Sequence, residues 1–174
     1  EDGIYINFPE YRIDIGIQVP FLGHSGVLLI DNKTGLTKYY EYGRYDSQNL
    51  GIVLNRAIPN VDMGKDGKPT EESLYNVLKY ISHIAGHDGP IEGAYVESDE
   101  FDAMNNYAQS RIDRNVDIGR ESYNIFENNC STFAEEVLKQ DKNVEDQIPA
   151  SIINVPNRIV KKWQKVFTPI KYEP

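Results

Sequence analysis

Apolar and polar residues alternate through the first part of the chain in a way that predicts β-strands. Apolar residues occupy every second position in residues 4–8 and again in 13–17, which is the period of a strand with one buried face. Residues 27–30 are continuously apolar, as in a strand that is buried on both faces. Turn-forming residues at 31–35 separate this run from a tyrosine-rich stretch at 36–42. We therefore predict a hairpin of two strands here.

Further along the chain the apolar residues recur every three or four positions, which predicts amphipathic helices. Thr70 is a candidate N-cap for the first helix, and Gly86 is a candidate end. Asp99 is predicted to cap a second helix, and Pro156 to open a last one. The predicted buried positions of these helices are Leu74, Val77, Leu78 and Ile81, then Phe101, Met104, Ala108 and Ile112, and finally Ile159, Val160, Trp163 and Phe167. Additional strands are predicted over 51–54, 91–96 and 122–126.

The length of the chain indicates how many domains it forms, and its net charge excludes some classes of partner. The 174 residues are enough for one domain with a real core, and we expect a single catalytic domain over 1–174. Because the chain begins at Glu1 rather than Met, we expect it to be processed or cut from a longer protein. The net charge of −9 argues against nucleic acid and anionic membrane surfaces as partners. The sequence contains neither a signal peptide nor an apolar run long enough to insert stably into a membrane.

The only cysteine, Cys130, is the first candidate for chemistry. Asn129 before it is a good N-cap, and apolar residues follow it at helical spacing. Cys130 is thus predicted in the first turn of a helix, where the N–H groups and the helix dipole stabilise a thiolate nucleophile. The adjacent Glu135 and Glu136 are predicted on a solvated face of this helix.

A nucleophilic cysteine needs a base, and the chain has three histidines. His24 stands at the start of a predicted strand between Gly23 and Gly26, where small neighbours leave its ring accessible. A cysteine at a helix start beside a histidine on a strand is the papain-type arrangement; the alternative is a purely structural histidine. His83 and His87 have a spacing that could bind zinc, but no third ligand is evident nearby. We predict no metal site and no cofactor.

The register of the predicted hairpin suggests a third catalytic residue. If Ile30 pairs with Thr37, Glu41 becomes a diagonal neighbour of His24 and can orient its ring. A slip of one residue would point Glu41 away and bring tyrosines into reach. Asp46, just beyond the strand, is the second candidate carboxylate. A solvated position on the strand is the alternative role for Glu41.

Three further residues are predicted to contact the substrate. Asn128 could donate a hydrogen bond to an oxyanion, as could the backbone N–H of Cys130; the alternative for Asn128 is a turn residue. Asn129 and Tyr42 are the other predicted substrate-binding residues, with Tyr42 in the wall of a groove suited to a short peptide.

Two motifs resemble the circularly permuted branch of the NlpC-type papain-like superfamily: residues 23–30 (GHSGVLLI) and 128–134 (NNCSTFA). In that branch, which includes lecithin retinol acyltransferase-like proteins and PPPDE peptidases, the histidine precedes the cysteine, as His24 precedes Cys130 here. The sequence is most similar to bacterial cell-wall amidase toxins that are delivered by type VI secretion. Residues 38–46 also resemble that group.

This resemblance implies a fold and an activity. The fold would be α+β and papain-like, with an antiparallel sheet packed against the cysteine helix. The activity would be cleavage of amide bonds in the stem peptide of peptidoglycan, through an acyl-enzyme on Cys130. Such a toxin is secreted by bacteria, acts in the periplasm of a target cell and implies a cognate immunity protein. The alternatives are a thiol acyltransferase or deubiquitinase-like peptidase of the same fold, and a non-catalytic binding module in which Cys130 and His24 are merely buried.

Overall fold

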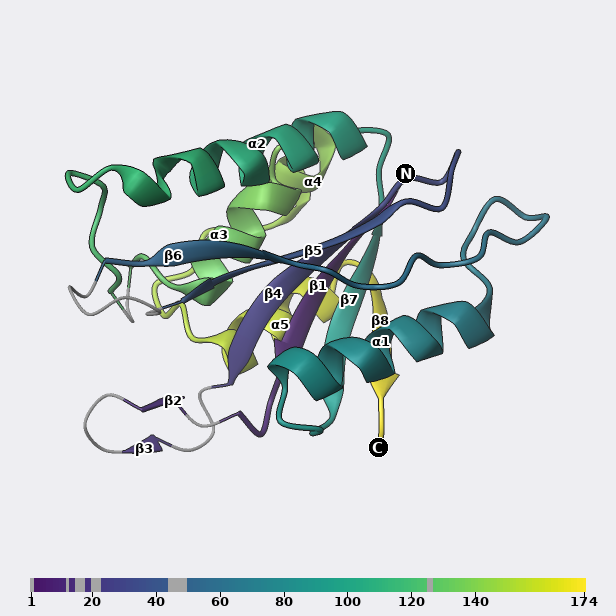
Figure 1. Ribbon diagram of the computed structural model, residues 1–174, viewed down its shortest axis with the longest axis horizontal. Helices are drawn as coiled ribbons and strands as arrows, with labels where there is room; N and C mark the ends of the chain where they lie inside the picture. The colour runs from purple at the N-terminus through teal and green to yellow at the C-terminus, as the bar shows by residue number, and fades with distance from the viewer. Residues whose placement is uncertain (1, 12, 15–17, 20–22, 44–49, 125–126) are drawn as a thin grey trace.

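The computed structural model of the protein describes the chain apart from residues 1, 12, 15–17, 20–22, 44–49 and 125–126 (Figure 1). The strands are β1 (Asp2–Phe8), β2 (Ile13–Asp14), β3 (Gln18–Val19), β4 (His24–Ile30), β5 (Thr37–Gly43), β6 (Ile52–Arg56), β7 (Ile91–Glu97) and β8 (Thr168–Tyr172). The helices are α1 (Glu71–Ala85), α2 (Phe101–Asp113), the 3₁₀ turn η1 (Arg114–Val116), α3 (Cys130–Leu138), α4 (Lys142–Gln147) and α5 (Pro156–Gln164).

Six strands form one antiparallel sheet in the order β6-β5-β4-β1-β7-β8, and β2 pairs with β3 in a separate small hairpin. Helix α1 covers one face of the large sheet, whereas α2, α3 and α5 cover the other (Figure 1). The protein is therefore α+β, as predicted, and the helix that starts at Cys130 packs against strands β4 and β5.

Each face of the sheet carries its own apolar core. Alternate residues of the central strands enter one core or the other; Val27 and Leu29 face α3, and Leu28 and Ile30 face the α1 side. Every residue of β4 is buried, which confirms a central strand covered on both faces. Burial on both faces fixes the register of β4, because a slip of one residue would exchange its two faces.

The β4–β5 hairpin has the register on which the predicted site depends. Ile30 pairs with Thr37, and Gly26 pairs with Glu41. Gly26 leaves room for the ring of Tyr39, because a Cβ atom at Gly26 would lie 2.3 Å from the Tyr39 hydroxyl. The absent side chain thus leaves room for the Tyr39 ring, whose hydroxyl reaches Glu41 two residues along the same strand.

The structure confirms most predicted elements and corrects several others. Thr70 caps α1 with its side chain, and Gly86 ends this helix. Helix α2 is capped by Glu100 and not by Asp99, and its cap has no side-chain hydrogen bond. Among the described residues of 122–126, isolated bridges at Ser122 and Asn124 replace the predicted strand. Helix α4 and strand β8 were not predicted.

Candidate active site

Cys130 is the first residue of α3, and Asn129 caps this helix. The Asn129 side-chain oxygen accepts hydrogen bonds from the N–H groups of Ser131 and Thr132, at 3.0 and 3.1 Å. The Thr132 hydroxyl in return accepts the Asn129 N–H at 2.8 Å, which completes a capping box. This reciprocal cap holds Cys130 in the first turn, where the helix dipole favours a negatively charged sulfur.

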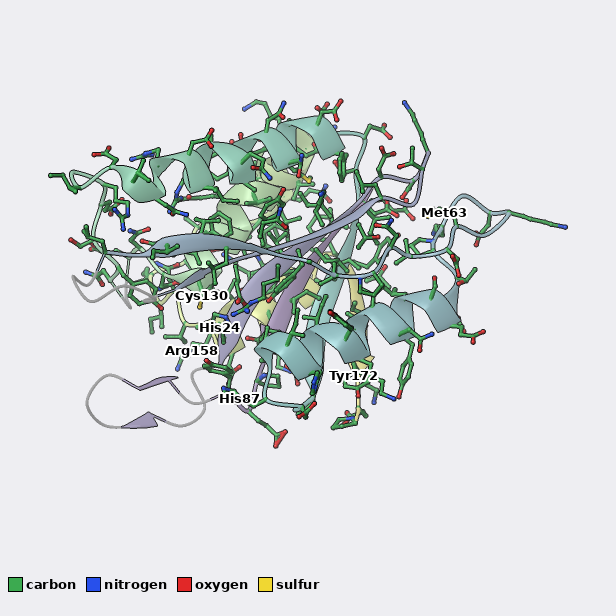
Figure 2. The ribbon with its side chains drawn as sticks, in the orientation of Figure 1. His24, Met63, His87, Cys130, Arg158 and Tyr172 are labelled. Carbon is green, nitrogen blue, oxygen red and sulfur yellow. The ribbon has the colours of Figure 1, made fainter. Side chains whose placement is uncertain are left out.

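His24, the first residue of β4, lies next to Cys130 (Figure 2). Its ring lies close enough to the Cys130 thiol for that group to raise the pKa of the imidazole, and its Nε2 lies 3.1 Å from Oε2 of Glu41. With Nε2 directed at the carboxylate, Nδ1 is the ring nitrogen available to the thiol. The structure therefore brings together the three predicted catalytic residues.

Two aromatic rings hold the imidazole of His24. Phe8 pairs with His24 across β1 and β4 and stacks on its ring, with centroids 5.8 Å apart. Tyr11 lies at 4.9 Å from the imidazole and also contacts His87 at 4.8 Å. The His24 side chain is only 9% exposed, so it is held in one orientation on a rigid strand rather than on a mobile surface.

Glu41 is completely buried and binds three neighbours. Its Oε2 accepts hydrogen bonds from His24 and from the Tyr39 hydroxyl, the latter at 3.0 Å. Its Oε1 accepts a hydrogen bond from Nε of Arg56, which projects from the neighbouring strand β6. A buried carboxylate is stable only when it is paired and hydrogen-bonded in this way.

These contacts change the proton affinities of His24 and Glu41 in opposite directions. Burial alone lowers the pKa of His24, but its interactions with Cys130 and Glu41 outweigh burial and raise it to about 10. Burial raises the pKa of Glu41, but His24 and Arg56 outweigh it and lower the value to about 2. The arrangement thus favours an ionised Glu41 beside an imidazolium, the charge state that a Cys–His nucleophile uses.

Tyr123 contacts Cys130 from the loop before α3. Its hydroxyl lies close enough to Cys130 for both the thiol and the backbone of that residue to affect its pKa. Burial and the neighbouring Cys130 raise the pKa of Tyr123 well above 10, so its hydroxyl stays protonated.

The predicted substrate-binding residues lie around this site, and their side chains form hydrogen bonds with other parts of the protein. The Asn128 amide donates hydrogen bonds to the Tyr42 hydroxyl at 3.1 Å and to the Ser122 carbonyl at 2.9 Å. Asn129 uses its carbonyl in the helix cap, and its amide donates to the Asn154 carbonyl at 3.0 Å. Their role toward substrate stays a prediction, and Asp46, the second candidate carboxylate, lies outside the described residues.

The expectation that Glu135 and Glu136 lie on a solvated face of the cysteine helix holds for Glu136, which is exposed, and is wrong for Glu135. Glu135 is buried rather than solvated, and it accepts a hydrogen bond from the Trp163 indole at 2.9 Å and pairs with Lys162 at 2.8 Å. Glu136 pairs with Arg111 at 2.9 Å. The carboxylate of Glu135 thus ties α3 to α5, because a buried indole N–H needs an acceptor.

The sequence did not point to Arg56 or Tyr123 as members of the site. Arg56 sits on edge strand β6, and Tyr123 sits in a loop without regular hydrophobic spacing. For Arg56, the available signal was an arginine on a strand that pairs with the strand of Glu41. For Tyr123, it was an aromatic residue shortly before the cysteine. Neither signal predicts a contact with Glu41 or Cys130 unless the pairing of the surrounding segments is already known.

The structure also bears on other types of site. Within the described part of the chain, no group of three or more His, Cys, Asp or Glu side chains is arranged to hold a metal ion. His83 instead pairs with Asp88 at 2.8 Å on the surface. Among the described helices, none has both the length and the apolar character needed to cross a bilayer.

Comparison with known proteins identifies the class. Residues 4–145, which include His24, Glu41 and Cys130, match the model of a family described as type VI secretion system effector TseH-like. The chain is also similar to the crystal structure of the type VI secretion system effector TseH, with 30% identity and a TM-score of 0.88 over 99% of this chain and 92% of that one. A search of curated proteins found no match.

These similarities place the protein among the effectors of bacterial type VI secretion. Within that class, the chain belongs to the TseH-like family. The likeness to type VI effectors that the two sequence motifs indicated is therefore confirmed.

Proposed function

We propose that the protein is a cysteine-dependent amidase that cleaves amide bonds in the peptide stems of bacterial peptidoglycan. The observation that carries this proposal is the linear arrangement of Cys130, His24 and Glu41, in which the thiol is at a helix start, the imidazole contacts it and a buried carboxylate orients the ring. Membership in a family of secreted effectors supports an antibacterial setting, and we place the action in the periplasm of the target cell.

The proposed reaction has two steps. The Cys130 thiol transfers its proton to His24, and the thiolate attacks the carbonyl carbon of the scissile amide. His24 then gives that proton to the leaving nitrogen, the C–N bond breaks, and an acyl-enzyme with a thioester bond to Cys130 remains. In the second step His24 takes a proton from water, the hydroxide attacks the thioester, and the thiol is released with its proton restored.

Groups around Cys130 support stabilisation of the intermediate. The carbonyl oxygen becomes negatively charged during the attack and needs fixed hydrogen-bond donors. The Cys130 N–H and the Tyr123 hydroxyl lie together at the sulfur and are the donors that we propose. Glu41 keeps the imidazole in the orientation that receives the proton, and its own proton affinity is low enough for it to stay ionised at neutral pH.

The order of the catalytic residues supports the proposed fold relationship. His24 on β4 precedes Cys130 on α3, which is the order of the permuted papain-like branch. The antiparallel sheet packed against α3 agrees with that architecture. An effector of this kind also requires a cognate immunity protein, which we propose blocks the Cys130 site. A producing-cell protein that co-purifies with the chain without inhibiting hydrolysis would count against that mode of inhibition.

The test is digestion of purified peptidoglycan sacculi. We expect the parent chain to release soluble fragments and new free amines, and mass spectrometry of the fragments should identify the amide that is cleaved. A Cys130→Ala chain, which retains the fold but lacks the nucleophile, should release none. Equal release by both chains, or no new amines from the folded parent chain, would contradict the proposed activity. Transfer of acyl groups to added amines without hydrolysis would favour the acyltransferase alternative.

A further inference from the structure

A polar cavity lies between the C-terminal end of α2, the start of β6 and the loop that precedes α3. Its volume is about 230 Å³, below the range of about 300–1,000 Å³ that is usual for sites holding a whole small molecule. Its lining is dominated by charged residues, namely Arg111, Arg114, Arg120, Glu121 and Glu136. A cavity of this size and lining suits one polar side chain or terminal group of a larger ligand.

The cavity is connected to the candidate active site through two tyrosines. Tyr42 lines the cavity and packs against Tyr123 with ring centroids 5.5 Å apart. Tyr123 in turn lies next to Cys130, which affects the pKa of its hydroxyl. Asn128, two residues before Cys130, also lines the cavity and holds the Tyr42 hydroxyl. A substrate whose scissile carbonyl lies at Cys130 therefore has this cavity next to it, beyond the Tyr42–Tyr123 ring pair.

The cavity is lined by more positive than negative side chains, although the chain as a whole is acidic. The protein carries a net charge of −9, yet three arginines face two glutamates here. Arg111 is already engaged, because it pairs with Glu136 at 2.9 Å and lies 5.2 Å above the Tyr42 ring. Arg120 donates to the Gly51 carbonyl at 2.9 Å and so holds the start of β6.

Arg114 is the arginine that can turn toward a ligand. It lies in the short turn η1 directly after α2, and its side chain is exposed. The ion pairs found among the described residues do not include Arg114. A guanidinium group binds a carboxylate through two parallel hydrogen bonds, which makes arginine a selective partner for that group.

We propose that this cavity binds a free carboxylate of the substrate, on a peptide residue close to the scissile amide, and that Arg114 makes the decisive contact. This inference rests on the proposed function and narrows its substrate to stem peptides with an acidic group next to the cleaved bond. Arg111, which is paired with Glu136, and Arg120, which is bonded to backbone carbonyls, shape the cavity and contribute a positive field.

Binding to a Cys130→Ala chain tests this inference without turnover. Isothermal titration would use two synthetic stem peptides that differ only in having their carboxylates free or amidated. We expect the free acid to bind about tenfold more tightly, because a hydrogen bond to a charged group is worth about 1.4 kcal/mol or more. Arg114→Gln should remove most of that difference, whereas Arg114→Lys should retain part of it, and Lys79→Gln, on the exposed side of α1, should retain all of it.

Equal affinities for the two peptides would overturn the inference, as would no binding of either peptide. An Arg114→Gln chain that discriminates as well as the Lys79→Gln chain would also overturn it. Sacculus digestion by the parent chain decides the proposed function separately, because an amidase without a carboxylate preference would still release amines. If the chain binds the acidic peptide tightly but never cleaves sacculi, the proposed function is wrong, whereas the proposed binding site stands.

Discussion

Replacement of His24 by alanine is expected to slow the hydrolysis of sacculi almost as much as replacement of Cys130 by alanine. We expect the rate to fall about 10⁴-fold or more in each variant. The reason is that the two side chains act as one unit: the thiol needs the imidazole to accept its proton, and every later proton transfer by the imidazole needs the acyl group that only Cys130 can carry. The double variant should therefore be no slower than either single variant. Initial rates of amine release from sacculi measure all three.

His83→Ala is the matched control for this prediction, because His83 is a surface histidine that pairs with Asp88 at the end of α1. It should hydrolyse sacculi at the parental rate. Far-ultraviolet circular dichroism would establish that each variant is folded. If the losses in the His24 and Cys130 variants simply multiplied in the double variant, the two residues would act independently and the proposed proton transfer between them would be wrong.

Alanine at Glu41 is expected to produce the largest loss of stability, about 3 kcal/mol in the free energy of unfolding. Removal of the carboxylate leaves Arg56 without its buried partner, and it leaves the buried Tyr39 hydroxyl without an acceptor. Activity should fall as well, since His24 loses the group that orients it. Urea unfolding at pH 7 measures the first effect. Glu173→Ala, at an exposed position near the C-terminus, is the matched control and should change stability by no more than about 0.5 kcal/mol.

The pH dependence of this effect has a definite sign. The pKa of Glu41 is about 2 in the folded protein, below its ordinary value of 4.5. Its ionised form therefore stabilises the fold fully above about pH 4.5, and the contribution is lost as the pH falls toward 2. The stability difference between the parent chain and Glu41→Gln should accordingly shrink on moving from pH 7 to pH 3. A difference that grows in acid would show that the carboxylate is not held in its charged form.

The sequence predicted the site well where local pattern determines geometry. The turn residues at 31–35 predicted the hairpin, and one of its two possible registers placed Glu41 beside His24. The structure has that register. The position of Cys130 followed from the capping chemistry of Asn129. Both are short-range effects, in which a residue and its partner are fixed by a few neighbours.

Features that depend on distant parts of the chain were not predictable. Arg56 reaches Glu41 only because β6 pairs with β5, and the sequence between these strands has no short-turn signature that would fix their register. Strand β8 contains Pro169, which argues against a central strand, and it is tolerated because β8 is an edge strand. Glu135 looked solvated because its burial depends on Trp163, which comes from another helix.

We propose that Cys130 is an activated nucleophile; in the alternative, a non-catalytic binding module, the buried thiol would be inert. Cys130 is only 1% exposed, so burial alone does not separate the two. The most direct measurement is alkylation of the folded protein by iodoacetamide at neutral pH, with intact-mass detection, because this chain has a single cysteine. We expect one adduct on the native parent chain, formed much more slowly in His24→Ala. A thiol that reacts only after denaturation, at the same rate with or without His24, would contradict it.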